Sequence, residues 1–259
     1  MIIYFSNLLS KAYYQYIVKK TLLLFGLSWS AKRYMDNVNQ WHQWKYDAQK
    51  EFNRWAQTYD RSILNRLLFR RCYMKFFELI LRNYPDRNQS LQLLDVGCGT
   101  GTFISMIAET DLEIHPFGLD MAEQMCKLGA DKAKQLGLDK ILHFITADSE
   151  HMPFEDASFD IVTCSNSFHH YPHQDLVLKE IYRVLKPDGL TIIIDGYVDN
   201  VIGWFVFDFC VAKAEGSVHH CRAAELKEKL ESANYTDIYQ EKFGFWVPVL
   251  ATVAKKKLI

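Results

Sequence analysis

Three glycines at alternate positions, placed just after an acid, are the residues of this chain best suited to binding a cofactor. Gly97, Gly99 and Gly101 follow Asp95, which stands near the end of the apolar run 91–96, and a helical stretch comes next. Glycine lets a backbone turn sharply while a ligand lies against it, because a Cβ would block that approach. The order of strand, glycine turn and helix therefore predicts a cofactor site at the end of this strand.

The spacing of the glycines separates two classes of cofactor. A dinucleotide-binding turn has its third glycine, or an alanine, at the sixth position of the motif. Here Thr102 holds that position, and the third glycine comes one residue early. The acid two residues before the first glycine also lies outside the dinucleotide pattern. A nicotinamide-dependent dehydrogenase is therefore disfavoured.

Two pairs of adjacent histidines could supply proton chemistry. His169 and His170 follow the predicted strand 159–164, at the edge where open α/β sheets bind ligands. An imidazole titrates near neutral pH and suits proton abstraction, so either residue is a candidate catalytic base. The alternative is that the pair only packs or shapes the substrate site. His219 and His220 are weaker candidates, expected near a helix N-terminus or at the pocket rim.

The cysteines do not predict a metal site. The six cysteines form no CxxC pair, and no cysteine or histidine spacing matches a zinc site. We therefore expect no metal, and we expect reduced thiols in a cytoplasmic compartment.

The middle of the chain alternates short β-rich runs with helical patterns, which is typical of a parallel sheet built from βαβ units. The predicted strands are 91–96, 113–119, 142–146, 159–164 and 190–195. The predicted helices of this part are 102–109, 122–136, 174–185 and 222–233, with earlier helices at 52–59 and 61–83. The runs 238–247 and 249–254 are close enough to pair as an antiparallel hairpin.

The composition is that of an ordinary globular protein, but the charge is unevenly distributed. Of 259 residues, 49% are hydrophobic and 24% are charged, which excludes a disordered or collagen-like chain. The net charge of -1 argues against a uniformly basic surface for nucleic acid. It hides a basic first third, with 14 Lys+Arg against 5 Asp+Glu over residues 1–84, or +9. The remainder then carries 16 basic and 26 acidic residues, or -10.

The stretch Asp95-Val-Gly97-Cys-Gly99-Thr-Gly101 resembles motif I of the class I S-adenosylmethionine (SAM)-dependent methyltransferases. The phrases from Met152 to Asp160 and from Arg183 to Gly189 are similar to linking segments of the branch that includes ubiquinone and menaquinone C-methyltransferases. The resemblance covers about residues 50–259. It implies a Rossmann-like, mostly parallel seven-stranded sheet that ends in an antiparallel hairpin. Residues 1–49 would form an N-terminal helical extension, and residues 197–221 an insertion that covers the substrate within the methyltransferase domain.

The same resemblance assigns cofactor contacts beyond the glycine turn. Asp120 would hold the ribose hydroxyls of SAM, since a carboxylate can accept from both hydroxyls of a diol, although it could also cap the next helix. Met121 would lie against the adenine or simply fill the core. Asp148 would bind the adenine amino group, with Asp139 or Ser149 as alternatives. The remaining expected contacts are Ser165 and Tyr59; Tyr59 belongs to a segment similar to one that folds over the cofactor, and packing is its alternative.

The resemblance implies methyl transfer to a small molecule by in-line displacement. Aromatic residues at 204, 205, 207 and 209 favour a hydrophobic or lipid-like acceptor, unless they only complete the core. Alternatives are an N- or O-methyltransferase of a soluble molecule and a SAM-binding subunit without turnover. A nucleic-acid methyltransferase is disfavoured, because Ser165-Asn-Ser-Phe is not a target motif of such enzymes.

The start of the chain is basic and amphipathic. Residues 1–35 contain Lys11, Lys19, Lys20, Lys32 and Arg33 but no acid, with apolar residues between them. This pattern is similar to a helix that lies in a membrane interface, and a solvated cap or dimer helix is the alternative. The lysines interrupt the apolar run, so we expect neither a transmembrane helix nor a cleaved signal peptide. The pattern does not indicate the oligomeric state.

Overall fold

A computed structural model describes residues 43–54, 63–215 and 218–258. The chain divides into two compact units, Met1–Tyr46 and Asp47–Ile259. Almost all of the first unit, including the basic segment 1–35, lies outside the described residues, as does Tyr59. The second unit contains every other residue that the sequence assigns to a site.

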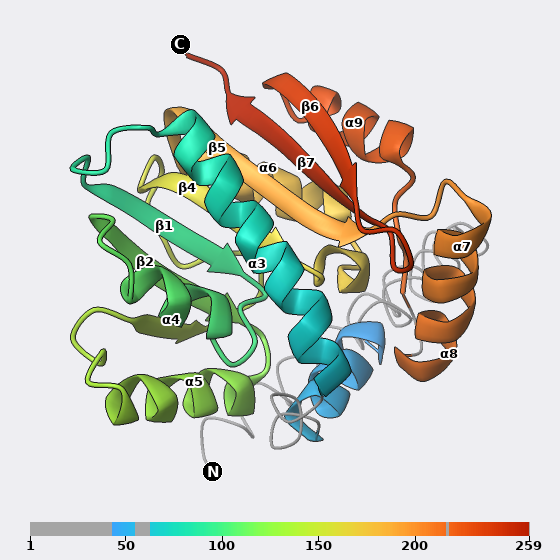
Figure 1. The fold of residues 1–259 in the computed structure, drawn as a ribbon, viewed down its shortest axis with the longest axis horizontal. Coiled ribbons are helices and arrows are strands. Elements are labelled where there is room, and N and C mark those ends of the chain that lie inside the picture. Colours follow the sequence, from blue (N-terminus) through green and yellow to red (C-terminus); the bar gives the residue numbers. More distant parts are fainter. Residues whose placement is uncertain (1–42, 55–62, 216–217, 259) are drawn as a thin grey trace, which may run out of the picture. The chain divides into compact units, whose positions relative to one another are not determined.

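A seven-stranded sheet forms the centre of the second unit (Figure 1). The strand order is β3-β2-β1-β4-β5-β7-β6, and all neighbours are parallel except the pairs that involve β7. The strands are β1 (Leu91–Val96), β2 (Ile114–Asp120), β3 (His143–Thr146), β4 (Phe159–Ser165), β5 (Leu185–Gly196), β6 (Tyr235–Phe243) and β7 (Val249–Lys256). The expected mostly parallel sheet with a C-terminal antiparallel hairpin is confirmed.

Helices cover both faces of this sheet. The described α-helices are 43–54, α3 (Ile63–Asn83), α4 (Thr102–Ala108), α5 (Glu123–Gln135), α6 (Gln174–Val184), α7 (Val201–Gly203), α8 (Ala212–Glu215) and α9 (Ala223–Ser232). A π-helical stretch η2 (Trp204–Val211) joins α7 to α8, and a short 3-10 turn η1 (Phe168–His170) follows β4. No helix within these described ranges is long and apolar enough to cross a membrane.

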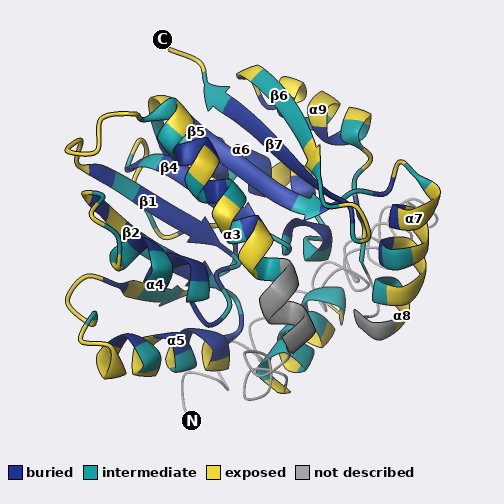
Figure 2. Cartoon of the chain, in the orientation of Figure 1, coloured by how far each residue is buried: buried dark blue, intermediate teal, exposed yellow. Residues whose placement is uncertain are grey.

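Two buried clusters hold the layers together. One joins α3, α4 and the η2 stretch to one face of the sheet through residues such as Phe76, Phe103 and Phe207. The other joins α6 and α9 to the opposite face through residues such as Leu178 and Leu230. Successive strand residues alternate between the clusters because side chains of a strand point to opposite faces. Figure 2 shows the resulting buried sheet between more exposed helices.

Two strands differ from the sequence prediction by more than two residues. The fifth strand begins at Leu185 rather than at residue 190, because Leu185 pairs with Phe159 before Pro187-Asp-Gly189 forms a bulge. Asp188 has a positive φ of 62° inside this bulge. The sixth strand is Tyr235–Phe243 rather than 238–247, so the exposed residues 245 and 246 belong to the turn before β7.

Candidate active site

The glycine turn lies between β1 and α4, as predicted, and all three glycines have left-handed backbones. The φ angles are 72° at Gly97, 54° at Gly99 and 68° at Gly101. An L side chain in this region costs roughly 1–2 kcal/mol per residue. The turn therefore requires glycine at each of the three positions for its backbone alone.

The space beside each glycine shows whether protein atoms or open space would meet an added Cβ. A Cβ at Gly97 would lie 2.3 Å from Ser167 Oγ, and one at Gly101 would lie 2.4 Å from the ring of Phe144. A Cβ at Gly99 would meet nothing within 4 Å. Protein atoms thus fill the space beside two glycines, while the middle one faces open space that a ligand can occupy.

Asp120 organises this open side from the end of β2. Its Oδ2 accepts from the Gly99 N–H at 2.8 Å, and its Oδ1 accepts from the Ala122 N–H at 2.8 Å. Burial raises the pKa of Asp120, and these backbone donors oppose the rise. The carboxylate braces the turn, and each oxygen has a second lone pair for a ligand hydroxyl. Asp120 is not the cap of α5, because Ala122 holds the N-cap position and the helix has no side-chain cap.

Asp95 lies beneath the turn. Its side chain is buried, and Thr163 Oγ1 donates to its Oδ1 at 2.7 Å. Burial raises the pKa of Asp95 to about 7; the Thr163 hydrogen bond opposes this rise and the charge of Asp120 adds to it. Asp95 thus joins the end of β1 to β4 through Thr163.

The other predicted cofactor residues lie at the same edge of the sheet. Met121 is half-buried directly after β2, and Ser165 ends β4, where its Oγ accepts from Asn166 Nδ2 at 3.1 Å. Asp148 follows β3, and its Oδ1 accepts from the Glu150 N–H at 3.0 Å. Ser149 beside it is buried.

A helix that the sequence did not assign to the site lies across this edge. In the helix 43–54, Gln49 Nε2 donates to the Met121 carbonyl at 2.9 Å. The ring of Phe52 meets that of His170 edge-to-face, with centroids 4.9 Å apart. This helix therefore contacts both the segment after β2 and the segment after β4. The helix predicted over 52–59 overlaps only its last three residues, and it stands just before residues 55–60, which resemble the segment over the cofactor.

His169 and Asp195 form a buried pair at the ends of β4 and β5. His169 Nδ1 lies 2.6 Å from Asp195 Oδ1, and the His169 backbone N–H donates to Oδ2 at 3.0 Å. Burial alone would raise the pKa of Asp195, but the charge and hydrogen bond of His169, with His220 and the Gly196 N–H, lower it to about 2. Asp195 is thus an anion that fixes the orientation of the His169 ring. The sequence pattern predicts Asp195 at a strand end but indicates no role for it.

Two further imidazoles flank His169. The His220 ring stacks on it with centroids 4.2 Å apart, and the His170 ring lies 4.2 Å away on a tilted plane. His220 is buried and its Nδ1 lies 3.5 Å from Asp208 Oδ1. The structure thus brings His169, His170 and one residue of the weaker pair together. The other, His219, pairs with Glu225 and is exposed.

The aromatic residues of the insertion do not share one environment. Phe207 is buried against Gly196 and lies 5.3 Å from the His220 ring between centroids. Trp204, Phe205 and Phe209 are each 52% exposed. Phe207 therefore completes the core, which was the alternative reading of these rings, while the helix presents the other three rings to the outside.

Among the residues that the structure describes, two groups of side chains could hold a metal ion, which the sequence spacing did not reveal. His169, Asp195 and His220 offer ligand atoms within 4.8 Å of one another, and so do His219, Cys221 and Glu225. The donors of the first group come from three separate segments. Because Asp195 already accepts two N–H groups of His169, hydrogen bonding accounts for the geometry of that group.

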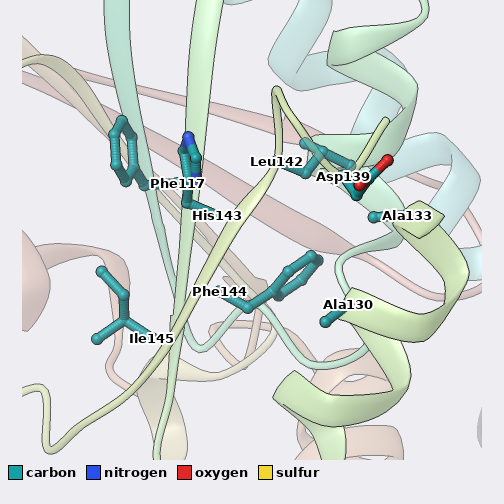
Figure 3. Close-up of a pocket in the computed structure, with 8 residues that line it drawn as sticks. All are labelled: Phe117, Ala130, Ala133, Asp139, Leu142, His143, Phe144 and Ile145. Carbon is teal, nitrogen blue, oxygen red and sulfur yellow. The ribbon is translucent and has the colours of Figure 1, made fainter. Parts of the chain in front are cut away.

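A hollow of about 440 Å³ lies along the edge strand β3, outside the site (Figure 3). Its lining residues come from β2, β3, α5 and the loop between α5 and β3, and include Phe117, His143 and Asp139. Neither the glycine turn nor the histidine cluster contributes to it. One of the apolar rings that line it, Phe144, also fills the space beside Gly101, so this edge supports the turn.

Comparisons with known proteins agree with this arrangement. Residues 94–193 match the family described as "Methyltransferase domain". The demethylmenaquinone methyltransferase of Listeria welshimeri is 34% identical over 156 residues, which are 60% of this chain and 64% of that protein. The match thus spans less than two thirds of that relative. The protein of the same name from Geobacillus kaustophilus is 29% identical over 231 residues, 81% of this chain and 97% of that protein.

The fold is shared with solved structures. A SAM-dependent methyltransferase from Methanosarcina mazei superposes with a TM-score of 0.56 and 21% identity, over 70% of this chain and 98% of that one. The open side of Gly99 and the braced carboxylate of Asp120 fit such a cofactor. Residues 94–193 of this chain therefore match a methyltransferase domain, and the chain shares its fold with that solved structure.

Proposed function

We propose that this chain methylates a carbon atom of a hydrophobic, hydroquinone-type acceptor, with His169 as the catalytic base. The observation that carries the proposal is the buried His169–Asp195 pair at the ends of β4 and β5. The names of the relatives support the acceptor class, since both are demethylmenaquinone methyltransferases.

The cofactor half of the site would hold SAM in a fixed direction. When bound, SAM supplies a methyl group on a cationic sulfur, ready for in-line displacement. The cofactor would lie against the open side of Gly99, and Asp120 would accept from its ribose hydroxyls. Met121 and Asp148 would contact the adenine. Asp95 would place negative charge beneath the glycine turn. Alignment of this kind can lower the barrier by roughly 7–11 kcal/mol.

The acceptor half would make the acceptor carbon nucleophilic. A quinone ring is poor in electrons, so we assign the reduced, hydroquinone form as the acceptor. His169 takes the proton of a ring hydroxyl, and the resulting anion delocalises onto the neighbouring ring carbon. That carbon bonds to the methyl group while the carbon–sulfur bond breaks and its electron pair stays on sulfur. The ring proton then moves to the oxygen, and His169 releases one proton to solvent.

Asp195 sets which nitrogen of His169 is the base. The carboxylate accepts from the ring at 2.6 Å, which places the proton of the neutral imidazole on Nδ1. Nε2 is then the basic nitrogen of this tautomer. Ser167 Oγ, bonded to the Val96 carbonyl at 3.2 Å, ties the same loop to the end of β1 and so to the glycine turn. The loop that carries His169 is thereby connected to the glycine turn that would hold the methyl donor.

The test is incubation of the full chain with SAM and a reduced short-chain demethylmenaquinone. The expected result is S-adenosylhomocysteine together with a ring C-methylated product, identified by mass spectrometry and NMR. A product methylated on oxygen would contradict the carbon assignment. Tight SAM binding without turnover of quinol, phenol or amine acceptors would instead indicate a SAM-binding subunit.

A further inference from the structure

An unusual amount of aromatic surface lies outside the site. Trp204, Phe205 and Phe209 on the η2 stretch are each 52% exposed, and Phe245 and Trp246 in the β6–β7 turn are each 75% exposed. We call these five residues the aromatic rim. At roughly 200 Å² per aromatic side chain, rings exposed to this degree present on the order of 600 Å². The largest apolar patch of a typical monomer is about 300–600 Å² and is often functional.

The two segments of the rim lie at the same end of the sheet. Phe207, between the exposed rings of the helix, packs on Gly196, and Gly196 pairs with Val249 at the start of β7. The β6–β7 turn ends beside this point, where the Tyr197 N–H donates to the Pro248 carbonyl at 3.0 Å. Figure 1 shows the turn next to the helix that runs from α7 to α8.

The rim is continuous with the acceptor half of the site. The inner face of the same helix contacts His220 through Phe207 and Asp208. His220 in turn stacks on His169. One helix therefore presents exposed rings outward and contacts the proposed catalytic cluster inward.

Three basic residues lie on or beside the elements that carry the rim, and two acids, Asp199 and Asp208, lie there as well. Lys213 is exposed on α8, Lys242 is exposed near the end of β6 with its Nζ 4.8 Å from the centre of the Tyr197 ring, and the Arg222 side chain is 72% exposed. Aromatic residues settle at the level of lipid headgroups, and basic residues near them bind anionic lipids. This combination fits a membrane surface better than a soluble protein partner.

We propose that the aromatic rim inserts into the interface of a bilayer that contains anionic phospholipid, and so brings a lipid-borne acceptor to the site. The inference rests on the proposed function for the nature of the acceptor, but the binding itself does not. It concerns a surface separate from the basic segment 1–35. The partner that the aromatic rim binds in this proposal is the lipid bilayer.

The test is flotation of the full chain with phosphatidylcholine vesicles that contain one quarter phosphatidylglycerol. The rim variant combines Phe205→Ser with Trp246→Ser, one residue from each segment. The matched control combines Leu136→Ser with Ile141→Ser, which are 49% and 42% exposed near α5 and β3. We expect the rim variant to bind vesicles at least tenfold more weakly than wild type, and the control to bind within twofold of it.

Turnover gives a second measurement that separates this inference from the proposed function. The rim variant should methylate a water-soluble short-chain quinol at the wild-type rate, and a long-chain quinol in vesicles at least tenfold more slowly. If the wild type methylates neither quinol, the proposed function fails while flotation still tests the rim. Equal flotation of rim variant, control and wild type would overturn the inference, whether the wild type binds through segment 1–35 or not at all.

Discussion

The two halves of the proposed ligand-binding edge are built in different ways. The cofactor half, at the ends of β1 to β3, uses backbone conformation: three left-handed glycines and a carboxylate that accepts from two backbone N–H groups. The acceptor half, at the ends of β4 and β5, uses side chains from distant segments: His169, Asp195 and His220. Only the glycine turn of the first half is a short continuous motif.

This difference reflects what each half has to recognise. A cofactor keeps one shape, so a turn that needs no particular side chains can cradle it. An acceptor varies between enzymes, and its chemistry requires side chains at chosen points on the same scaffold. Changes in the cofactor half should therefore alter SAM affinity and stability. Changes in the acceptor half should alter turnover with SAM affinity preserved.

The largest expected effect is on turnover in the acceptor half. His169→Gln and Asp195→Asn should each lower kcat roughly 10²–10⁴-fold, the usual contribution of a general base, with the Kd for SAM changed less than threefold. His173 provides a matched control, since its Nδ1 lies 3.0 Å from Glu150 Oε1 in a second histidine–carboxylate pair. His173→Gln should keep kcat within threefold. Equal losses in the two pairs would show that His169 acts only through the fold.

The next effect is on stability in the cofactor half. Gly97→Ala introduces a left-handed alanine and a 2.3 Å contact with Ser167, which should together cost roughly 2–5 kcal/mol of unfolding free energy. Gly99→Ala introduces only the backbone strain, about 1–2 kcal/mol, but its methyl enters the proposed cofactor space. Urea unfolding and SAM titration measure both. If the alanine at 99 leaves SAM affinity unchanged, the cofactor does not lie against this residue.

A smaller effect concerns acid stability in the acceptor half. The pKa of Asp195 is about 2 in the fold, below its ordinary value of 3.8, so its ionisation stabilises the folded state above about pH 4. This contribution, roughly 2 kcal/mol, is lost as pH falls from about 4 through 2. Asp195→Asn should therefore lower the unfolding free energy by this amount at pH 7 and by nothing near pH 2. A difference that persists at pH 2 would indicate a packing defect instead.

The smallest expected effect is that of metal removal. The histidine cluster could in principle bind a cation, but its close contact is a hydrogen bond that suits proton transfer. Dialysis against EDTA should leave kcat with the short-chain quinol within about 1.5-fold of its starting value. Loss of activity that zinc, manganese or iron restores would show that His169, Asp195 and His220 hold a metal, and the base mechanism would be wrong.

The sequence pattern predicted most strands and helices of the sheet to within a few residues. It succeeded because buried parallel strands are apolar throughout, and because apolar residues recur every three to four positions along a helix that packs on a core. It failed at the bulge of β5, where proline and glycine looked like a turn but Leu185 still pairs with Phe159. It also failed at the β6–β7 turn, because Phe245 and Trp246 have strand propensity but are exposed. In both places, pairing and burial override local preference.

What the sequence determined by itself was the cofactor half. Asp95, the three glycines and the order of strand and helix are close together in the sequence. Because the left-handed backbone of the turn requires glycine, this pattern predicts the same local structure wherever it occurs. Only the tertiary structure decided the acceptor half. Asp195 and His220 reach His169 because β5 lies beside β4 and because the chain after η2 returns over the same edge. No local pattern records that proximity, since strand order and loop return bring those residues together.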